Sequence, residues 1–167
     1  ALKACAFSLA LKKGRHIHSQ VTQSGFEQEL FVANGLIDMY AKCGHIQDAE
    51  QIFIGLQTKD VVTWNALIAG YAKNECGLNA VQLFREMCQN GIEPDKVTYI
   101  AILKACAAIA ALQQGKQIHT RIIAAGLESD DFLGSALVDM YSKCGSIDSA
   151  QDVFDELPVR DVVVWTT

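Results

Sequence analysis

The segment at residues 35–53, GLIDMYAKCGHIQDAEQIF, recurs 101 residues later at residues 136–154 as ALVDMYSKCGSIDSAQDVF. Almost every position keeps the same residue or a close substitute. The same offset relates LKACA at residues 2–6 to LKACA at residues 103–107, so the repeated unit covers the whole chain. Because repeats that stack into arrays are usually about 20 to 50 residues long, this period must contain smaller units.

The helical signals divide the period into units of 31, 35 and 35 residues, each closed by an acidic residue. The closing residues are Glu29, Asp60, Asp95, Asp130 and Asp161. We therefore predict complete units at 30–60, 61–95, 96–130 and 131–161, with parts of two more at 1–29 and 162–167. Since both ends of the chain fall inside units, we expect it to be a piece of a longer array.

Each unit shows two apolar stripes with the spacing of an α-helix. In unit 61–95 they are Trp64, Leu67, Ile68 and Tyr71, and then Ala80, Leu83, Phe84 and Met87. Asn74 and Gly77 interrupt the pattern, and Gly91 with Pro94 ends it, because Gly suits a left-handed cap and Pro cannot continue a helix. Each unit is therefore predicted to be a helical hairpin, and neighbouring hairpins must stack to bury both stripes.

The composition fits a fully helical array. Half of the residues are hydrophobic, yet no apolar run approaches the roughly 20 residues that a membrane span needs, so we expect no contact with a membrane. Gly115 occupies the position where other units have Ala49, Ala80 or Ala150. We interpret Gly115 as a packing residue that lets helices approach closely, at a cost of about 1 kcal/mol in helix propensity.

Six cysteines raise the possibility of disulfides or a zinc site. Cys5 and Cys106 are equivalent in the repeat, as are Cys43 and Cys144, and no C-x-x-C spacing occurs. We expect reduced thiols in core or turn positions, no metal site and no cofactor. The sequence also lacks a phosphate-binding glycine loop, a nucleophile elbow and a deaminase signature, so we expect no enzyme activity and no small-molecule substrate for this chain.

One face of each predicted first helix carries a different chemistry from the core stripe. In unit 61–95 this face holds Val62, Asn65, Ala69 and Lys73; units 30–60 and 131–161 hold Phe31, Asn34, Asp38 and Lys42, and Phe132, Ser135, Asp139 and Lys143. An apolar group can pack on a base, an amide or hydroxyl can reach a base edge, and an ammonium can meet a phosphate. The pattern is therefore typical of single-stranded RNA binding.

Residues 62–95, 102–130 and 135–161 closely resemble the pentatricopeptide repeat (PPR) family. The unit lengths and the KCG turns at 42–44 and 143–145 resemble the P, L and S variants of the plant PLS subclass. This resemblance implies a right-handed α-solenoid with a partial L unit (1–29), then S (30–60), P (61–95), L (96–130), S (131–161) and the start of a P unit (162–167). The tetratricopeptide repeat, which builds similar hairpins of about 34 residues, leaves a protein-interaction scaffold as the alternative.

The resemblance implies that the fifth and last residues of each unit select one base. The pairs are Asn34 with Asp60, Asn65 with Asp95, Ile100 with Asp130 and Ser135 with Asp161, and Thr166 opens a further site. The implied base-packing residues are Phe31, Val62, Val97, Phe132 and Val163, and the implied phosphate contacts are Lys42, Lys73 and Lys143. In the family's code these pairs read 5′-UUNG-3′, because Ile100 cannot make a selecting hydrogen bond.

The implied biological role is recognition of C-to-U editing sites in the single-stranded RNA of a mitochondrion or chloroplast. L units in such proteins are expected to bind multiple organellar RNA editing factor proteins, and a deaminase-like domain can follow the array. The net charge of −5 argues against non-specific nucleic-acid binding, so binding should depend on base contacts.

Each site residue also has a purely structural interpretation. A terminal Asp can cap the next helix, an Asn can be a solvated surface group, and a Lys near a helix C-terminus can interact with the helix dipole.

Overall fold

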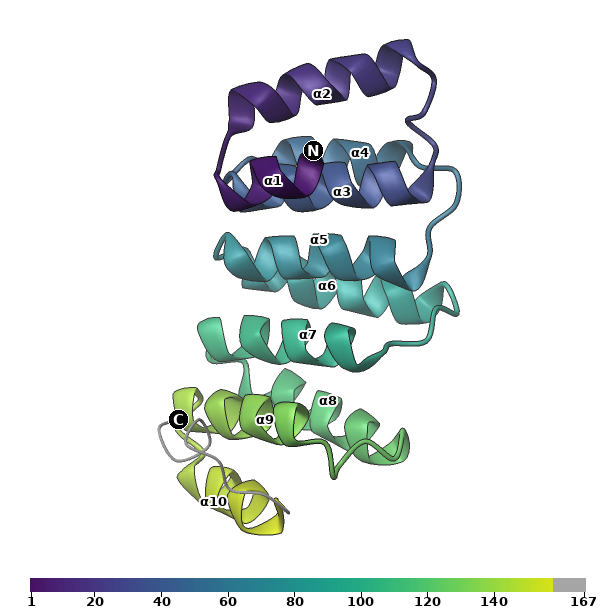
Figure 1. Ribbon diagram of the computed structural model, residues 1–167. Coiled ribbons are helices and arrows are strands. Elements are labelled where there is room, and N and C mark those ends of the chain that lie inside the picture. The colour runs from purple at the N-terminus through teal and green to yellow at the C-terminus, as the bar shows by residue number, and fades with distance from the viewer. Residues whose placement is uncertain (158–167) are drawn as a thin grey trace.

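The computed structural model describes residues 1–157, which form ten α-helices in five antiparallel pairs and no strand (Figure 1). The helices are α1 (Leu2–Phe7), α2 (Leu11–Gln23), α3 (Leu30–Lys42), α4 (Ile46–Gly55), α5 (Val61–Lys73), α6 (Gly77–Gln89), α7 (Lys96–Ala108), α8 (Leu112–Ala124), α9 (Asp131–Lys143) and α10 (Ile147–Glu156). The predicted all-α array of hairpins is confirmed. Asp161, Val163 and Thr166, which were predicted as site residues, lie outside the described residues.

The helices form two layers. The first helices of the hairpins, α1, α3, α5, α7 and α9, stack directly on one another. The second helices α2, α4, α6 and α8 each pack on their own first helix and on the first helix of the next hairpin, and α10 packs on α9. Figure 1 shows the resulting elongated stack, in which the first helices lie roughly parallel to one another and across the long direction of the molecule. One face of every first helix therefore forms a continuous surface along the molecule.

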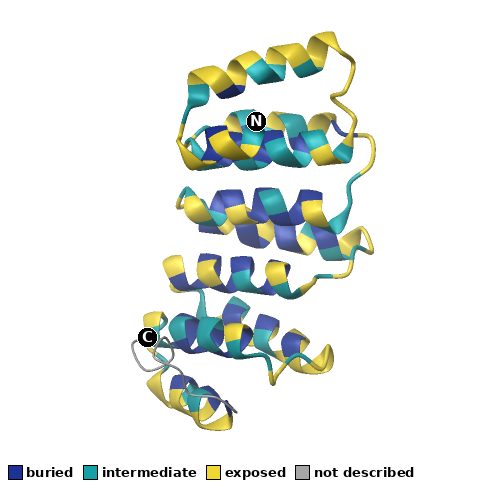
Figure 2. Cartoon of the chain, in the orientation of Figure 1, coloured by how far each residue is buried: buried dark blue, intermediate teal, exposed yellow. Residues whose placement is uncertain are grey.

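A single hydrophobic core runs through the stack. Both apolar stripes predicted for unit 61–95 are buried, and the core extends without a break from Cys5 to Val153. Figure 2 shows that buried residues concentrate in the first-helix layer, whereas α2 at the end of the stack is largely exposed. The rings of Phe53 and Trp64 meet edge to face, with centroids 4.9 Å apart, and so join two neighbouring hairpins.

The turns inside the hairpins differ between units. Gly44 and Gly145 of the KCG turns have φ of +80° and +74°, a left-handed conformation that glycine adopts without strain. In the turn between α5 and α6 the left-handed residue is Glu75, with φ of +60°, which lies between Asn74 and Gly77. Gly77 is already the first residue of α6 and is buried against Ile109, so its small size serves packing between helices.

Gly115 has the packing role that its sequence position predicts. A Cβ on Gly115 would collide with Met140 of the next hairpin, and a Cβ on the equivalent Gly14 would collide with Met39. Both glycines therefore let a second helix approach the following first helix, which offsets their unfavourable helix propensity. Within residues 1–157, no helix is both long and apolar enough to cross a bilayer.

Candidate nucleic-acid interface

A row of exposed apolar side chains follows the first-helix layer. Phe31, Val62, Val97 and Phe132 each lie in the second position of α3, α5, α7 and α9, and are 83%, 53%, 56% and 70% exposed. These four residues, hereafter the apolar row, are the described members of the predicted base-packing set. Apolar side chains that repeat on an exposed face are candidates for contact with a ligand, because burial in the core does not explain them.

Beside the apolar row, Asn65, Asp95 and Thr98 form a hydrogen-bonded site, hereafter the Asn65 site. Asn65 Nδ2 donates to Asp95 Oδ1 at 2.9 Å, which joins the two residues that were predicted to select a base. The Thr98 hydroxyl lies 2.6 Å from Asn65 Oδ1 and 2.9 Å from Asp95 Oδ1. Asn65 is only 6% exposed, so it is not a solvated surface amide.

This network fixes the direction of the Asn65 amide. A carboxylate only accepts hydrogen bonds, so the amide must turn its nitrogen toward Asp95 and its oxygen toward the hydroxyl of Thr98. One proton on Nδ2 is then used by Asp95, and Asn65 Oδ1 already has a donor in Thr98. The second Nδ2 proton is the group left to donate to a ligand.

Asp95 is at the same time the N-cap of α7. Its side chain accepts from the Thr98 backbone N–H at 2.9 Å, and its own N–H donates to Thr98 Oγ1 at 3.0 Å, which completes a capping box. Burial alone would raise the pKa of Asp95, but hydrogen bonds from Thr98 and Asn65 lower it below its usual range. Asp95 is therefore a charged acceptor at neutral pH, and the capping role and the site role hold together.

The site of unit 30–60 pairs Asn34 with Asp60 in a different way. Asp60 caps α5 through the Thr63 backbone N–H at 2.8 Å, and the Thr63 hydroxyl donates to the same carboxylate oxygen at 2.7 Å. A hydrogen bond from Asn34 helps to lower the pKa of Asp60, against the opposing effect of burial. Asn34 Oδ1 is buried and has no hydrogen-bond partner among the described residues, whereas Asn65 Oδ1 has Thr98.

In unit 96–130, Ile100 and Asp130 make no selecting pair, because Ile100 has no polar side-chain atom. Asp130 Oδ1 caps α9 by accepting the backbone N–H groups of Phe132 and Leu133, both at 3.0 Å. Asp130 Oδ2 accepts from Lys96 Nζ at 2.6 Å. We call Lys96, Ile100, Asp130 and Phe132 the Ile100 site.

The site of unit 131–161 is described only in part. The Ser135 hydroxyl donates to the backbone carbonyl of Asp131 at 2.9 Å. Its predicted partner, Asp161, lies outside the described residues. Ser135 is therefore placed on the first-helix face, but its pairing stays a prediction.

The three predicted phosphate contacts have different surroundings. Lys42 and Lys143 form ion pairs with Asp38 and Asp139 one helical turn earlier, each with a shortest N–O distance of 2.8 Å. Lys73 is exposed and has no ion pair or hydrogen bond with a described residue. Because neighbouring carboxylates offset the charge of the other two, Lys73 is the best-placed cation for a phosphate.

Lys73 borders a groove of about 440 Å³ between α5 and α7. The groove is lined by Ala69, Ala72, Lys73, Val97, Ile100, Ala101 and Lys104. Lys104, which sequence reasoning missed, is exposed on its wall, so two ammonium groups flank an apolar floor. Sequence reasoning also missed Thr98 and Lys96, whose contacts join residues more than 30 positions apart and leave no local pattern.

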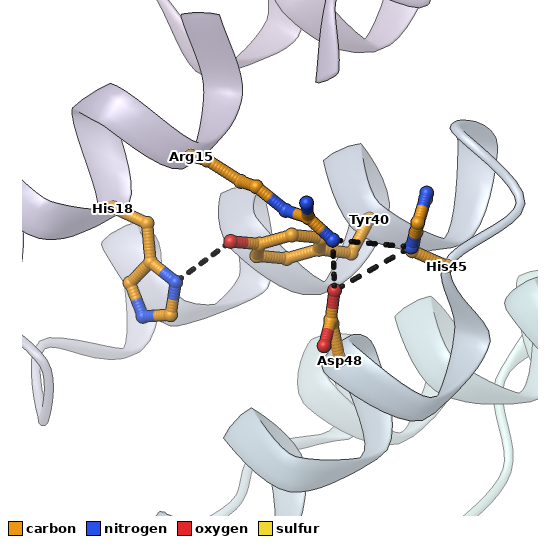
Figure 3. Close-up of polar contacts among 5 residues, drawn as sticks. All are labelled: Arg15, His18, Tyr40, His45 and Asp48. Atoms are coloured by element: carbon orange, nitrogen blue, oxygen red, sulfur yellow. Dashed lines mark hydrogen bonds and ion pairs between the residues drawn. The ribbon is translucent and has the colours of Figure 1, made fainter. Parts of the chain in front are cut away.

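A second polar cluster lies on the other layer, between α2 and α4 (Figure 3). It borders a hollow of about 560 Å³. Arg15 Nη2 lies 3.3 Å from Asp48 Oδ2, His45 Nδ1 lies 3.6 Å from the same oxygen, and His18 Nδ1 lies 2.9 Å from the Tyr40 hydroxyl. Burial and the charge of Asp48 raise the pKa of Tyr40, although Arg15 opposes them.

The equivalent residues 101 positions later show which contacts of this cluster recur in the repeat. His119 and Tyr141 repeat the His–Tyr contact at 3.0 Å, but the positions of His45 and Asp48 are taken by Ser146 and Ser149. We therefore interpret the His–Tyr pair as a structural contact between consecutive hairpins. All six cysteines are free, and burial raises the pKa of Cys106 to about 12, so its thiol is protonated at neutral pH.

Comparison with protein families identifies the repeat. The PPR repeat family model matches residues 59–108, and the PPR repeat model matches residues 31–61 and 135–162, which together make up more than half of the chain. The chain belongs to the pentatricopeptide repeat family. This confirms the family that the sequence resembles.

Many plant PPR proteins are similar along nearly the whole chain. The chain is 41% identical over 165 residues to pentatricopeptide repeat-containing protein At4g18520, chloroplastic, and 42% identical over 172 residues to CRR2, chloroplastic, both of Arabidopsis thaliana. These matches cover 99% of this chain but only 27% and 26% of the relatives. Another relative, At3g09040, is mitochondrial, so these names bear out the expected organellar location. The chain spans about a quarter of the length of the first two relatives.

Solved PPR structures share the fold. The crystal structure of PPR10 from maize has a TM-score of 0.72 at 24% identity, over 93% of this chain and 23% of PPR10. PPR10 in complex with an 18-nt psaJ RNA element has a TM-score of 0.71 at 24% identity, over 86% of this chain and 22% of PPR10. At this level of identity the likeness establishes the α-solenoid.

Proposed function

We propose that this chain binds single-stranded RNA in a sequence-specific manner, with one base facing each unit. The observation that carries the proposal is the Asn65 site, where a buried amide with a fixed direction lies beside the exposed apolar row. An apolar platform next to one oriented donor is the arrangement expected for a base that is packed on one side and read at its edge. The solved complex of PPR10 with an RNA element supports the same ligand class.

The charge distribution supports selective rather than general binding. The chain has a net charge of −5, and two of the three predicted phosphate lysines are paired with aspartates. Affinity must therefore depend on base contacts more than on phosphate neutralisation, and it should change only modestly with salt. The preferred sequence in this proposal is 5′-UUNG-3′, read from the N-terminal to the C-terminal unit.

In the same proposal, the chain is the recognition segment of a PLS-type factor for C-to-U editing in a plant organelle. The array would hold a chosen stretch of transcript, and a deaminase that is separate or joined to the array would act on a nearby cytidine. Multiple organellar RNA editing factor proteins are the proposed protein partners of its L units. The contacts argued for the Asn65 site do not depend on this wider role.

Fluorescence anisotropy with short labelled RNAs at two salt concentrations tests the proposal. We expect RNAs that contain UUNG to bind more tightly than scrambled RNAs of equal composition, with weak overall affinity because few units take part. Equal binding of both RNAs would sink the proposal of sequence-specific recognition.

The variant Asn65→Ser tests the assignment of the second base. We expect its preference at the second position to move from U toward G, because the hydroxyl replaces the oriented amide next to Asp95. Since Asn65 is buried, a stability loss of about 1 kcal/mol should accompany the change. Asn79→Ser, the same substitution at an exposed position of α6 in the other helix layer, is the matched control and should leave base preference unchanged. An unaltered preference in a folded Asn65→Ser variant would count against the site.

A further inference from the structure

The first residue of unit 96–130 distinguishes this unit from its neighbours. The first residues of the four units are Leu30, Val61, Lys96 and Asp131. Lys96 is the positively charged residue among these four. Its side chain extends to Asp130, the last residue of its own unit, and to Phe132 in the next unit. Its Nζ lies 2.6 Å from Asp130 Oδ2 and 4.4 Å from the centroid of the Phe132 ring.

These two contacts involve the groups that a base would use. Asp130 closes unit 96–130, at the position that Asp95 occupies in the Asn65 site. Phe132 is the next member of the apolar row after Val97. One ammonium group therefore pairs with the selecting carboxylate and lies over the packing surface at the same time.

The surroundings favour this position of Lys96. The side chains of Lys96 and Asp130 are 40% and 25% exposed, so the pair is partly shielded from solvent. An ammonium over an aromatic face is attracted by the ring electrons, which adds a second contact to the ion pair. The pairing also helps to keep the pKa of Asp130 below its usual range, although burial acts in the opposite direction.

We propose that Lys96 closes the base site of unit 96–130, so that this unit passes over one nucleotide without reading it. The proposal rests on the RNA-binding function above and deepens it by naming a residue that determines specificity. Ile100 removes the selecting donor, and Lys96 binds Oδ2 of the closing carboxylate and lies over the Phe132 ring. The unit is thus blocked by two independent changes.

Comparison with unit 61–95 makes the proposal testable. The second and third residues are the same in both units, Val62 with Thr63 and Val97 with Thr98, and both units end on Asp. At the first and fifth positions, unit 61–95 has Val61 and Asn65 where unit 96–130 has Lys96 and Ile100. Conversion of these two positions should therefore turn a silent unit into a uridine-reading unit.

The experiment measures binding of four RNAs that differ only at N in UUNG. We expect Ile100→Asn alone to change the preference at N by less than about twofold, because Lys96 still holds Asp130. The double variant K96V/I100N should prefer U at N by about fivefold or more, as one added selecting hydrogen bond would give. Full uridine preference in Ile100→Asn alone would overturn the proposal.

Charge loss needs its own control, because any lysine can contribute to RNA affinity. Lys104→Val removes an exposed cation from the same layer that has no contact with Asp130 in the described structure. We expect Lys104→Val to weaken binding of every RNA, and Lys96→Val to bind as tightly as the unsubstituted chain or more tightly. An equal loss in both variants would mean that Lys96 holds a phosphate, and would overturn the proposal.

Asn65→Ser, measured with four RNAs that differ only at the second position of UUNG, separates this inference from the proposed function. If Asn65→Ser moves the base preference at the second position toward G while K96V/I100N gains no base preference at N, only the proposed role of Lys96 fails. If neither variant changes base preference and both remain folded by circular dichroism, the proposed function fails and the inference fails with it.

Discussion

The Asn65 site and the Ile100 site are built on the same hairpin fold, one unit apart, yet they leave different groups available. At the Asn65 site, Thr98 and Asp95 hold an amide so that one N–H stays free. At the Ile100 site, Lys96 pairs with Asp130 Oδ2 and lies over one face of the Phe132 ring. Equivalent positions in two units therefore place their side chains in the same location, whereas a few further contacts decide whether a side chain is available to a ligand.

The largest expected effect comes from the core that supports both sites. Trp64 is buried against Phe53, so Trp64→Ala should destabilise the stack by about 3 to 5 kcal/mol, measured by urea unfolding. Because one core runs beneath both sites, the stack should unfold in one transition, and base preference at the Asn65 site should be lost in that transition. Val62→Ala, which shortens an exposed residue of the apolar row, is the control and should leave stability nearly unchanged. Two separate unfolding transitions would show that the sites do not share a core.

The next effect in size compares the two aspartates. Asp95→Ala removes a helix cap and the acceptor of a buried amide, for an expected cost of about 1 to 3 kcal/mol. Asp130→Ala removes a cap and an ion pair, for a cost of about 1 kcal/mol. Thermal melting measures both costs, and RNA binding separates the roles. Only Asp95→Ala should lose uridine preference; a similar loss of base reading in both variants would erase the distinction between the sites.

The hairpins could be predicted because each depends on local patterns. The stripe of Trp64, Leu67, Ile68 and Tyr71 has the helical period, and it is buried as predicted. The KCG turns and the packing role of Gly115 also follow from residue type and position. The predicted break at Asn74 and Gly77 is confirmed, since α5 ends at Lys73 and α6 begins at Gly77; the left-handed residue between them is Glu75, whose residue type does not indicate that conformation.

The sequence predicted where the site residues lie, but not which hydrogen bonds and ion pairs they form. The helical spacing of one face predicted the positions of Phe31, Val62 and Phe132, and the family resemblance added Val97; all four are exposed. The polar partners on these faces lie 30 or more positions apart along the chain, so no local spacing reveals them. Thr98 is 33 residues from Asn65, and Lys96 is 34 residues from Asp130. Such contacts require the geometry of the stack.

The smallest predicted effect concerns Thr98, which belongs to unit 96–130 but orients the amide of unit 61–95. Thr98→Val keeps the shape of the side chain and removes the hydroxyl that donates to Asn65 Oδ1. A buried acceptor without a donor should cost about 1 kcal/mol of stability. Without the Thr98 hydroxyl the Asn65 amide can also rotate. The ratio of the affinities for U and C at the second position should therefore fall about fivefold, the factor that corresponds to about 1 kcal/mol.

Thr63→Val is the matched control for this variant, since Thr63 occupies the same position in unit 61–95. The Thr63 hydroxyl donates to Asp60 at 2.7 Å, whereas the Thr98 hydroxyl lies 2.6 Å from the amide oxygen of Asn65 in addition to its contact of 2.9 Å with Asp95. Thr63→Val should therefore cost similar stability while leaving discrimination at the first position nearly intact. After Asp130 the corresponding residue is Leu133, which has no hydroxyl, so an Asn introduced at position 100 would resemble Asn34, whose Oδ1 has no donor among the described residues, rather than Asn65. Equal losses of discrimination in the two threonine variants would show that both hydroxyls act only through helix capping, and that amide orientation does not separate the Asn65 site from its neighbours.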